Sequence, residues 1–235
     1  MTTTEILREL EQYGDGQTKK TLMKHGAKEP FFGVKVADLK KILKKTKKNH
    51  ELSLELYSTG NSDAMYLAGL MADENKITEE QLNDWIGQAY WYYLCEHAVP
   101  MVAAETSFGF ELGLKWIQSD KENIASGGWS TLSVHAALKQ DKDLDINKYS
   151  QLLDKIAVEI HGSQNRVRHT MNGFIIAIGI SIKDLTEKAK AIAAKIGSVE
   201  VDMHGTACKV PSATDYINKA EATGLIGKKR KSARC

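Results

Sequence analysis

Apolar residues recur at every third or fourth position along nearly the whole chain, which is the spacing of amphipathic α-helices. Helix-start signals such as Thr2 with Glu5, and helix-stop signals such as Gly197, divide this pattern into thirteen segments. Pro100 lies inside an apolar stretch and is expected to kink or split its helix. The predicted helices cover residues 4–13, 17–25, 36–47, 51–58, 63–73, 79–88, 90–105, 108–118, 121–139, 147–161, 164–179, 182–196 and 213–222.

The connections between these helices are short, so successive helices are expected to pack as antiparallel neighbours. Their spacing of roughly 18–22 residues matches a helical-repeat solenoid with a two-helix unit of about 40 residues. We therefore predict an all-α solenoid of about six antiparallel helix pairs, which forms a single domain over residues 1–227. Residues 228–235 are predicted to form a basic C-terminal tail.

Residues 198–211 break the helical pattern. Apolar and polar positions alternate on both sides of a turn at Gly205, with Val199 and Val201 on one arm and Cys208 and Val210 on the other. This alternation predicts a β-hairpin near residues 199–210. A single hairpin is marginally stable in water, so it must lean on the helices or be ordered by a partner. Insertions in solenoids tend to lie on the binding face, which makes the hairpin a candidate probe; a structural cap on the last repeat is the equal alternative.

The composition excludes several classes of protein. With 42% hydrophobic residues and only 3 Pro among 235 residues, the chain is neither disordered nor of low complexity. It has no apolar run of membrane-spanning length, no readable secretory signal, and no standard nucleotide-hydrolysis, serine-hydrolysis or zinc-protease motif. Its 3 Cys lack metal-ligand spacing and indicate a reducing compartment. We therefore expect a cytoplasmic, nucleoid-associated monomer without a cofactor or metal.

The charge is strongly segregated along the chain, although the net charge is only +2. Residues 1–50 hold twelve basic and six acidic side chains, residues 51–100 hold one and nine, and residues 201–235 hold seven and three. One basic cluster crowds the helix predicted at 36–47, and a second occupies the tail at 228–234. An isolated lysine-rich helix face is commonly just solvated, but two clusters at opposite ends favour a polyanion partner such as DNA.

Two further segments combine residue types that suit nucleic acid. Residues 90–97 place four aromatic side chains in a row, and Glu96 lies four positions after Tyr92, on the same helix face. At least one aromatic ring should reach a groove or the surface, and an aromatic ring beside a carboxylate suits a site that stacks on bases; alternatively, Trp91 joins the core while the tyrosines cover a neighbouring helix. Residues 162–169 form a helix N-terminus with two arginines and a histidine, which suits a phosphate, unless the arginines only pack their stems on a neighbour.

Two glycines, Gly127 and Gly128, lie inside a predicted helix, where each costs about 1 kcal/mol relative to alanine. Close approach of another helix, or of a ligand backbone, would offset this cost. The sequence leaves both explanations open.

Two segments resemble the HEAT-like-repeat DNA alkylation repair proteins of the AlkC/AlkD superfamily. Residues 31–42, which read FFGVKVADLKKI, resemble the entry segment of that family. Trp116–Asp120 followed by Glu122–Ile124 resembles its "W-x-x-S/D-x-N-x-W" stretch. The resemblance covers nearly the whole chain and implies a HEAT-like fold. The closing stretch, residues 201–211 through 227–231, is most similar to the divergent AlkF/AlkG-like branch.

The resemblance also implies roles for particular positions. In the glycosylase members, an aspartate and two tryptophans line the place where an alkylpurine loses its sugar bond, and the carboxylate stabilises the positive charge that develops. The aspartate position falls on Glu96 and the first tryptophan position on Tyr92. The second tryptophan position falls near residues 171–174, which contain no Trp, and the helper arginine position falls on Gly127–Gly128. A carboxylate displaced by about 1 Å can lose about two orders of magnitude in rate.

We therefore predict a DNA-binding protein related to the alkylpurine DNA glycosylases but without efficient glycosylase activity. It is expected to bind duplex or branched DNA through a concave basic surface and the hairpin. One alternative is a monofunctional N3/N7-alkylpurine DNA glycosylase that uses Glu96 and Tyr92; a second is a protein–protein scaffold. The predicted DNA contacts are Lys35, Lys40, Lys44, Trp91, Ser163, Arg166, Arg168, His169, Met203, His204, Lys228, Lys229 and Arg230.

Overall fold

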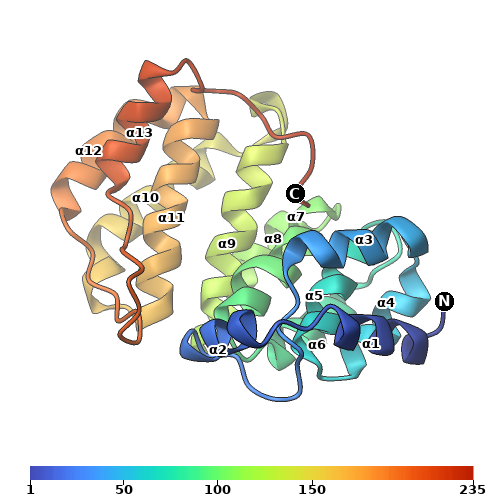
Figure 1. Ribbon diagram of the computed structural model, residues 1–235. Coiled ribbons are helices and arrows are strands. Elements are labelled where there is room, and N and C mark those ends of the chain that lie inside the picture. Colours follow the sequence, from blue (N-terminus) through green and yellow to red (C-terminus); the bar gives the residue numbers. More distant parts are fainter. Residues whose placement is uncertain (235) are drawn as a thin grey trace.

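The computed structural model describes residues 1–234, and its regular elements in this range are all helices, with no strand (Figure 1). The last residue of the predicted tail, Cys235, lies outside the described residues. No helix within residues 1–234 is both long and apolar enough to cross a membrane. The α-helices are α1 (Thr3–Gln12), α2 (Gly16–Lys24), α3 (Val36–Thr46), α4 (His50–Ser58), α5 (Ser62–Met71), α6 (Glu79–Gln88), α7 (Val99–Glu105), α8 (Gly109–Trp116), α9 (Glu122–Leu138), α10 (Ile146–Glu159), α11 (Asn165–Ser181), α12 (Thr186–Ile196) and α13 (Ala213–Ala222).

The helix boundaries follow the local start and stop signals closely. Thr2 and Glu5 form a reciprocal capping box at the start of α1, and Ser212 accepts a hydrogen bond from the first turn of α13. Gly197, with φ +63°, ends α12 in the left-handed region that favours glycine. The all-helical prediction is therefore confirmed for the described residues.

Helix α9 stands between two hydrophobic cores (Figure 1). Ile124 and Val134 of α9 pack against the first core, which is built from α1–α8 and the π-helix at residues 93–98. Trp129 and Leu132, which are fully buried, belong to the second core, which α9 shares with α10–α13. Because α9 packs against α7 and α8 on one side and against α11 on the other, it fixes how the two halves of the molecule meet.

The two glycines in α9 allow this close packing. A Cβ atom added at Gly127 would lie 2.5 Å from Cδ1 of Ile86 and 2.9 Å from the carbonyl oxygen of Cys95. A Cβ atom added at Gly128 would lie 2.6 Å from the backbone nitrogen of Ile117. Of the two explanations left open by the sequence, the structure selects the approach of neighbouring helix backbones.

Replacing Gly128 by alanine is expected to lower the free energy of unfolding by about 1–3 kcal/mol, because the added methyl group forces the backbone at Ile117 to move. Gly173 provides a matched control, since it also lies in a helix, α11, but its added Cβ meets no atom within 4 Å. Alanine at Gly173 is expected to leave stability unchanged or to raise it by up to about 1 kcal/mol. Urea unfolding of both variants checks this, and equal destabilisation would contradict the packing argument.

The helix that contains Glu96 changes its winding before Pro100. Residues Tyr93–Ala98 form a π-helix, which passes directly into α7 at Val99. Proline has no backbone N–H and its ring clashes with the carbonyl four residues earlier, which for Pro100 is the carbonyl of Glu96. The expected interruption at Pro100 therefore takes the form of a π-helical turn, a winding that is frequent at functional sites.

The β-hairpin predicted near residues 199–210 is not formed in this structure. The segment consists of two extended arms around a turn at His204 and Gly205, with no strand pairing between them. The arms bond to side chains of α11 instead: Asn165 exchanges two hydrogen bonds with the backbone of Asp202, and Asn172 donates to the carbonyl of Pro211. These side chains satisfy backbone groups that a hairpin ladder would have used. We call residues 198–211, which connect α12 to α13, the α12–α13 loop.

The C-terminal tail packs across the molecule, from α13 to the end of α5. Residues 227–234, called here the C-terminal strap, run over the end of α9 and finish near α3 and α7 (Figure 1). The backbone N–H of Arg230 donates to the carbonyl of Ala137, and Nζ of Lys229 donates to the carbonyl of Ala136. Arg234 donates to the carbonyl of Ala72. The strap therefore satisfies carbonyl groups at the ends of α9 and α5, where the helix dipole favours cations.

Candidate functional site

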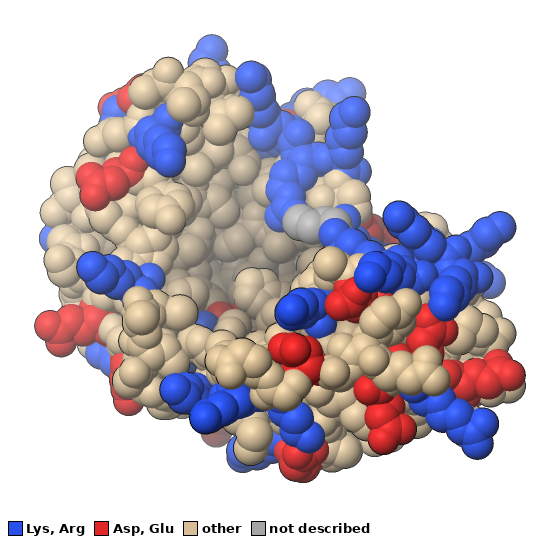
Figure 2. All heavy atoms as spheres, in the orientation of Figure 1, with Lys and Arg blue, Asp and Glu red and all other residues tan. Residues whose placement is uncertain are grey.

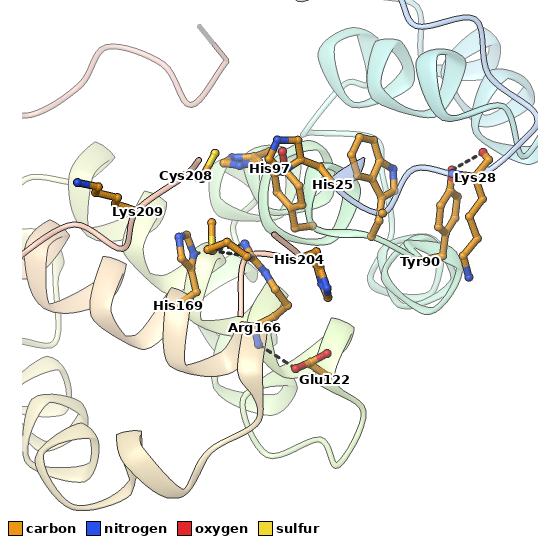
Figure 3. A pocket seen from close by; sticks show the side chains of 14 residues that line it. His25, Lys28, Tyr90, His97, Glu122, Arg166, His169, His204, Cys208 and Lys209 are labelled. Carbon is orange, nitrogen blue, oxygen red and sulfur yellow. Dashed lines mark hydrogen bonds between the residues drawn. The ribbon is translucent and has the colours of Figure 1, made fainter. Parts of the chain in front are cut away.

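A cleft of about 470 Å³ lies between the two halves of the molecule. The end of α2 and residues 90–97 contribute His25, Tyr92 and His97, and α11 contributes Arg166 and His169. The α12–α13 loop closes one side of the cleft with Met203, His204, Cys208 and Lys209 (Figure 3). The sequence clusters at 90–97 and 162–169, which are separated by about seventy positions, therefore meet in a single site with the loop.

Arg166, which lines this cleft, forms a bidentate ion pair with Glu96, whose side chain lines a second, smaller cavity and not the cleft itself. Nε of Arg166 donates to Oε1 of Glu96 at 2.7 Å, and Nη2 donates to Oε2 at 2.6 Å. The side chain of Glu96 is only 3% exposed and that of Arg166 is 16% exposed. Nδ1 of His169 lies 3.6 Å from Oε2 of Glu96. Both oxygens of the carboxylate are therefore engaged by the guanidinium group.

The same pair controls the ionisation of Glu96. Burial acts to raise the pKa of Glu96, but the contacts with His169 and Arg166 outweigh it and hold the pKa below its usual value. The pKa of Arg166 is raised, because the hydrogen bonds and charge of Glu96 outweigh its own burial. Glu96 is therefore a carboxylate whose charge is already neutralised by a fixed cation.

Tyr92 lies against this ion pair. The guanidinium carbon of Arg166 lies 4.9 Å from the centroid of the Tyr92 ring, a cation–π contact. The rings of His25 and His97 lie edge-on to Tyr92, at centroid distances of 6.0 and 6.1 Å. One face of the Tyr92 ring is thus covered by Arg166 and is not open for stacking on a base.

Trp91, which was predicted to contact DNA, lies in the core. It is only 5% exposed, and its indole N–H donates to the hydroxyl of Ser62 at 2.9 Å. This corresponds to the part of the alternative in which Trp91 joins the core, whereas Tyr92 lines the cleft. Because its indole group is held inside the protein, Trp91 forms a wall of the cleft and not a stacking platform.

The N-terminus of α11, which was expected to bind a phosphate, is occupied by protein groups. The backbone N–H of Arg166 donates to Oε1 of Glu122 at 2.8 Å (Figure 3). The hydroxyl of Ser163 donates to the carbonyl of Glu159, and Nη2 of Arg168 donates to Oδ1 of Asn165 at 3.4 Å. A carboxylate thus accepts from the N–H group of Arg166, one of the groups that the sequence suggested for a phosphate.

The two positions that lack the family's residues are also accounted for. Met171 and Phe174, near the second tryptophan position, are buried in the second core and do not line the cleft. Gly127, at the helper arginine position, packs against the carbonyl of Cys95, the residue before Glu96. An arginine does contact Glu96, but it is Arg166, which comes from α11.

The two basic clusters at opposite ends of the sequence meet in space. Lys48, just after α3, and Arg234, in the strap, share the carboxylate of Glu74 at 2.7 and 3.0 Å. Figure 2 shows Lys and Arg side chains gathered over the strap and over α3, along the edge of a hollow between the two halves. The floor of the hollow, seen from this side, carries few charged side chains. The positive charge therefore lies on the rim of the concave surface.

The predicted basic contacts differ in their exposure. Lys35, Lys44 and Lys228 are exposed and Lys40 is half-buried. Lys229 is only 8% exposed, because it pairs with Asp141 at 2.7 Å, and it is held within the strap. Arg230, which donates from Nη2 to the carbonyl of Ala233, is also engaged within the strap. In the cleft region, His204 is exposed while Met203 and His169 are half-buried.

Two carboxylates that accept hydrogen bonds from backbone N–H groups, those of Asp63 and Glu122, were not singled out from the sequence. Asp63 accepts hydrogen bonds from the backbone N–H groups of Phe32, Gly33 and Val34, and so anchors the entry segment at residues 31–34. Asp63 follows the N-cap residue Asn61, and an acidic residue in the first turn of a helix was a readable signal. Glu122, at the start of α9, carried the same signal.

Comparisons with known proteins agree with this geometry. Residues 6–213 match the sequence family described as DNA alkylation repair enzyme. The chain is 35% identical over 218 residues to the uncharacterized proteins Lin0241 of Listeria innocua and Lmo0209 of Listeria monocytogenes, covering 90% of this chain and 94% of each relative. It is also similar to a solved structure described as "a new family of proteins related to the HEAT-like repeat DNA glycosylases with affinity for branched DNA structures", with a TM-score of 0.93, 37% identity and full coverage of both chains.

Proposed function

This chain belongs to the DNA alkylation repair enzyme family, and from that premise we propose that it binds branched DNA by its shape and does not excise bases. Within the family we propose the AlkF/AlkG-like branch, which the order of motifs at residues 201–211 and 227–231 favours. The similarity to a structure described as having affinity for branched DNA supports the choice of ligand.

The observation that carries the proposal is the ion pair of Glu96 with Arg166. A glycosylase carboxylate must stabilise positive charge that develops on the substrate. Glu96 already has a permanent cation on both of its oxygens, at 2.6 and 2.7 Å, so its field at the cleft is largely cancelled. Breaking this pair to admit a substrate would leave a buried charge unpaired, which costs several kcal/mol. The pair supports a positioning role for Glu96, in which it holds α11 against the π-helix.

The charge on the rim supports DNA as the partner and argues against a protein–protein scaffold. The exposed lysines of α3 and of the strap gather at the hollow (Figure 2). Cations placed in this way neutralise phosphates and release counterions, without reading any base. A hollow with a weakly charged floor and a basic rim suits DNA that bends or branches, because a straight duplex meets only part of the rim.

Binding to a four-way junction and to a linear duplex of equal length, across a salt titration, tests this proposal. We expect tighter binding to the junction at low salt and a steeper fall of its association constant with salt, so that its advantage over the duplex narrows as salt rises, because more phosphates are contacted. Equal affinities for the two DNAs, or binding without a salt dependence, would contradict the proposal.

The second candidate function is an alkylpurine DNA glycosylase. One observation favours it: Tyr92 lines the same cleft as Arg166, beside the family's carboxylate position at Glu96. This function requires Arg166 to swing away when DNA binds, so that Glu96 faces the substrate. Release of methylated purines that is abolished by Glu96→Gln would establish it.

A further inference from the structure

The cations of the C-terminal strap are divided between an inner and an outer set. Lys229 and Arg234, each only 8% exposed, form the inner set. They contact Asp141, Glu74 and carbonyl groups at the ends of α9 and α5. Lys228 and Lys231, which are exposed, form the outer set. The inner set anchors the strap, so the outer set is held at a fixed place on the surface.

The lysines of α3 are divided in the same way. Lys41 and Lys45 form ion pairs with Asp38 and Glu9, and Lys48 pairs with Glu74. Lys40 and Lys44, one helical turn apart on a different face, have no carboxylate partner among the described residues.

The unpaired face of α3 is the face next to the strap. Val36 lines a small cavity together with Arg230 and Ala233 of the strap. Residues four positions apart share a helix face, so Lys40 and Lys44 continue the stripe that begins at Val36. Figure 2 shows the basic side chains of the strap and of α3 following one another along the edge of the hollow.

We propose that Lys40, Lys44, Lys228 and Lys231 form one phosphate-binding ridge that holds a second duplex arm of a branched DNA while the first arm lies in the hollow. This inference rests on the proposed function and adds the place of the second arm. The ridge lies on the outer edge of the hollow and the floor carries few charges (Figure 2). A single duplex on the floor would leave the ridge unused, whereas an arm that diverges from it would reach the ridge. The contacts are to phosphates, so they depend on DNA shape and not on sequence.

The test replaces all four ridge lysines by glutamine and compares affinities for a four-way junction and a linear duplex. A matched control replaces four exposed lysines on other elements, Lys76, Lys142, Lys195 and Lys219, so that the same net charge is removed. We expect the junction affinity of the ridge variant to fall by about tenfold or more. The slope of the logarithm of its association constant against the logarithm of the salt concentration should become shallower by about 2–4, since each lysine–phosphate contact contributes about 0.9 to that slope. Its duplex affinity should change by less than about threefold.

The variant Arg234→Gln extends the test, because it loosens an anchor of the strap and leaves all four ridge lysines in place. It should weaken junction binding selectively as well. The proposed ridge is wrong if the ridge variant binds the junction as tightly as the wild type. It is also wrong if the ridge variant loses as much affinity for the duplex as for the junction, or if the control variant loses as much junction affinity as the ridge variant. A wild-type protein that binds junction and duplex equally overturns the proposed function itself, so the two failures are distinguishable.

Discussion

Replacement of Arg166 by alanine is expected to lower the free energy of unfolding by about 3–5 kcal/mol. The substitution leaves the carboxylate of Glu96, which is 3% exposed, without its bidentate partner. It also removes the cation over the Tyr92 ring and the link from α11 to the π-helix. Denaturant unfolding, followed by circular dichroism, measures the change.

Two variants sharpen this test. Arg8, which is exposed on α1, provides a matched arginine, and Arg8→Ala should change stability by less than about 0.5 kcal/mol. The double variant Arg166→Met with Glu96→Leu should recover most of the lost stability, because it removes the buried charges together. If Arg166→Ala costs less than about 1 kcal/mol, the ion pair does not hold the two elements together and the positioning role of Glu96 is wrong.

Replacement of Asp63 by alanine is expected to lower the free energy of unfolding by about 3–4 kcal/mol. Each hydrogen bond to a charged group contributes about 1.5–3 kcal/mol, and the contributions of the three bonds are not fully additive. The carboxylate accepts from the N–H groups of Phe32, Gly33 and Val34 at 2.6, 3.0 and 3.0 Å. Gly33 has φ +81°, so the turn that presents these groups has little freedom to find other partners. Thermal unfolding with calorimetry measures the effect.

The control for Asp63 is Asp84, which is exposed on α6. Asp84→Ala should be neutral or slightly stabilising, because alanine is the better helix former. Asp63→Asn should fall between wild type and Asp63→Ala, since one amide oxygen remains as an acceptor. Similar stabilities for Asp63→Ala and Asp84→Ala would show that the three hydrogen bonds do not stabilise the entry segment.

The helices could be predicted from the sequence because their signals are local. Apolar periodicity, the Thr2–Glu5 capping box and the glycine stops each act within a few residues, and α6 and α13 lie where they were expected. The hairpin prediction failed for the opposite reason. Alternation at residues 199–210 describes an extended chain, but whether its arms pair depends on Asn165 and Asn172, which lie far away in the sequence.

The candidate site was predicted only in parts. Glu96, Tyr92 and Arg166 were each singled out for their chemistry, and Arg166 does join them: it lines the cleft with Tyr92 and pairs with Glu96, which does not line the cleft. The bidentate pairing of Glu96 with Arg166 spans 70 positions, and no spacing rule connects them. The phosphate site expected at the start of α11 stays a prediction, and the sequence did not show that Glu122, from another helix, reaches the N–H group of Arg166.

The meaning of the charge pattern also changed with the fold. The sequence showed two basic ends and an acidic middle, but not whether the ends share a face. Glu74, from the acidic middle, joins them by contacting both Lys48 and Arg234. Part of the positive charge thus holds the strap in place, and only the remaining lysines are exposed to a partner.

A single-turnover experiment tests directly whether the protein binds branched DNA without excising bases: excess protein is mixed with a four-way junction that carries N3- and N7-methylpurines. Bound junction and released bases are measured in the same sample. We predict that the junction is bound and that bases are released no faster than without protein, because Arg166 neutralises Glu96. Release well above the protein-free rate, and lost in Glu96→Gln, would show that Glu96 is catalytic and that the protein is a glycosylase.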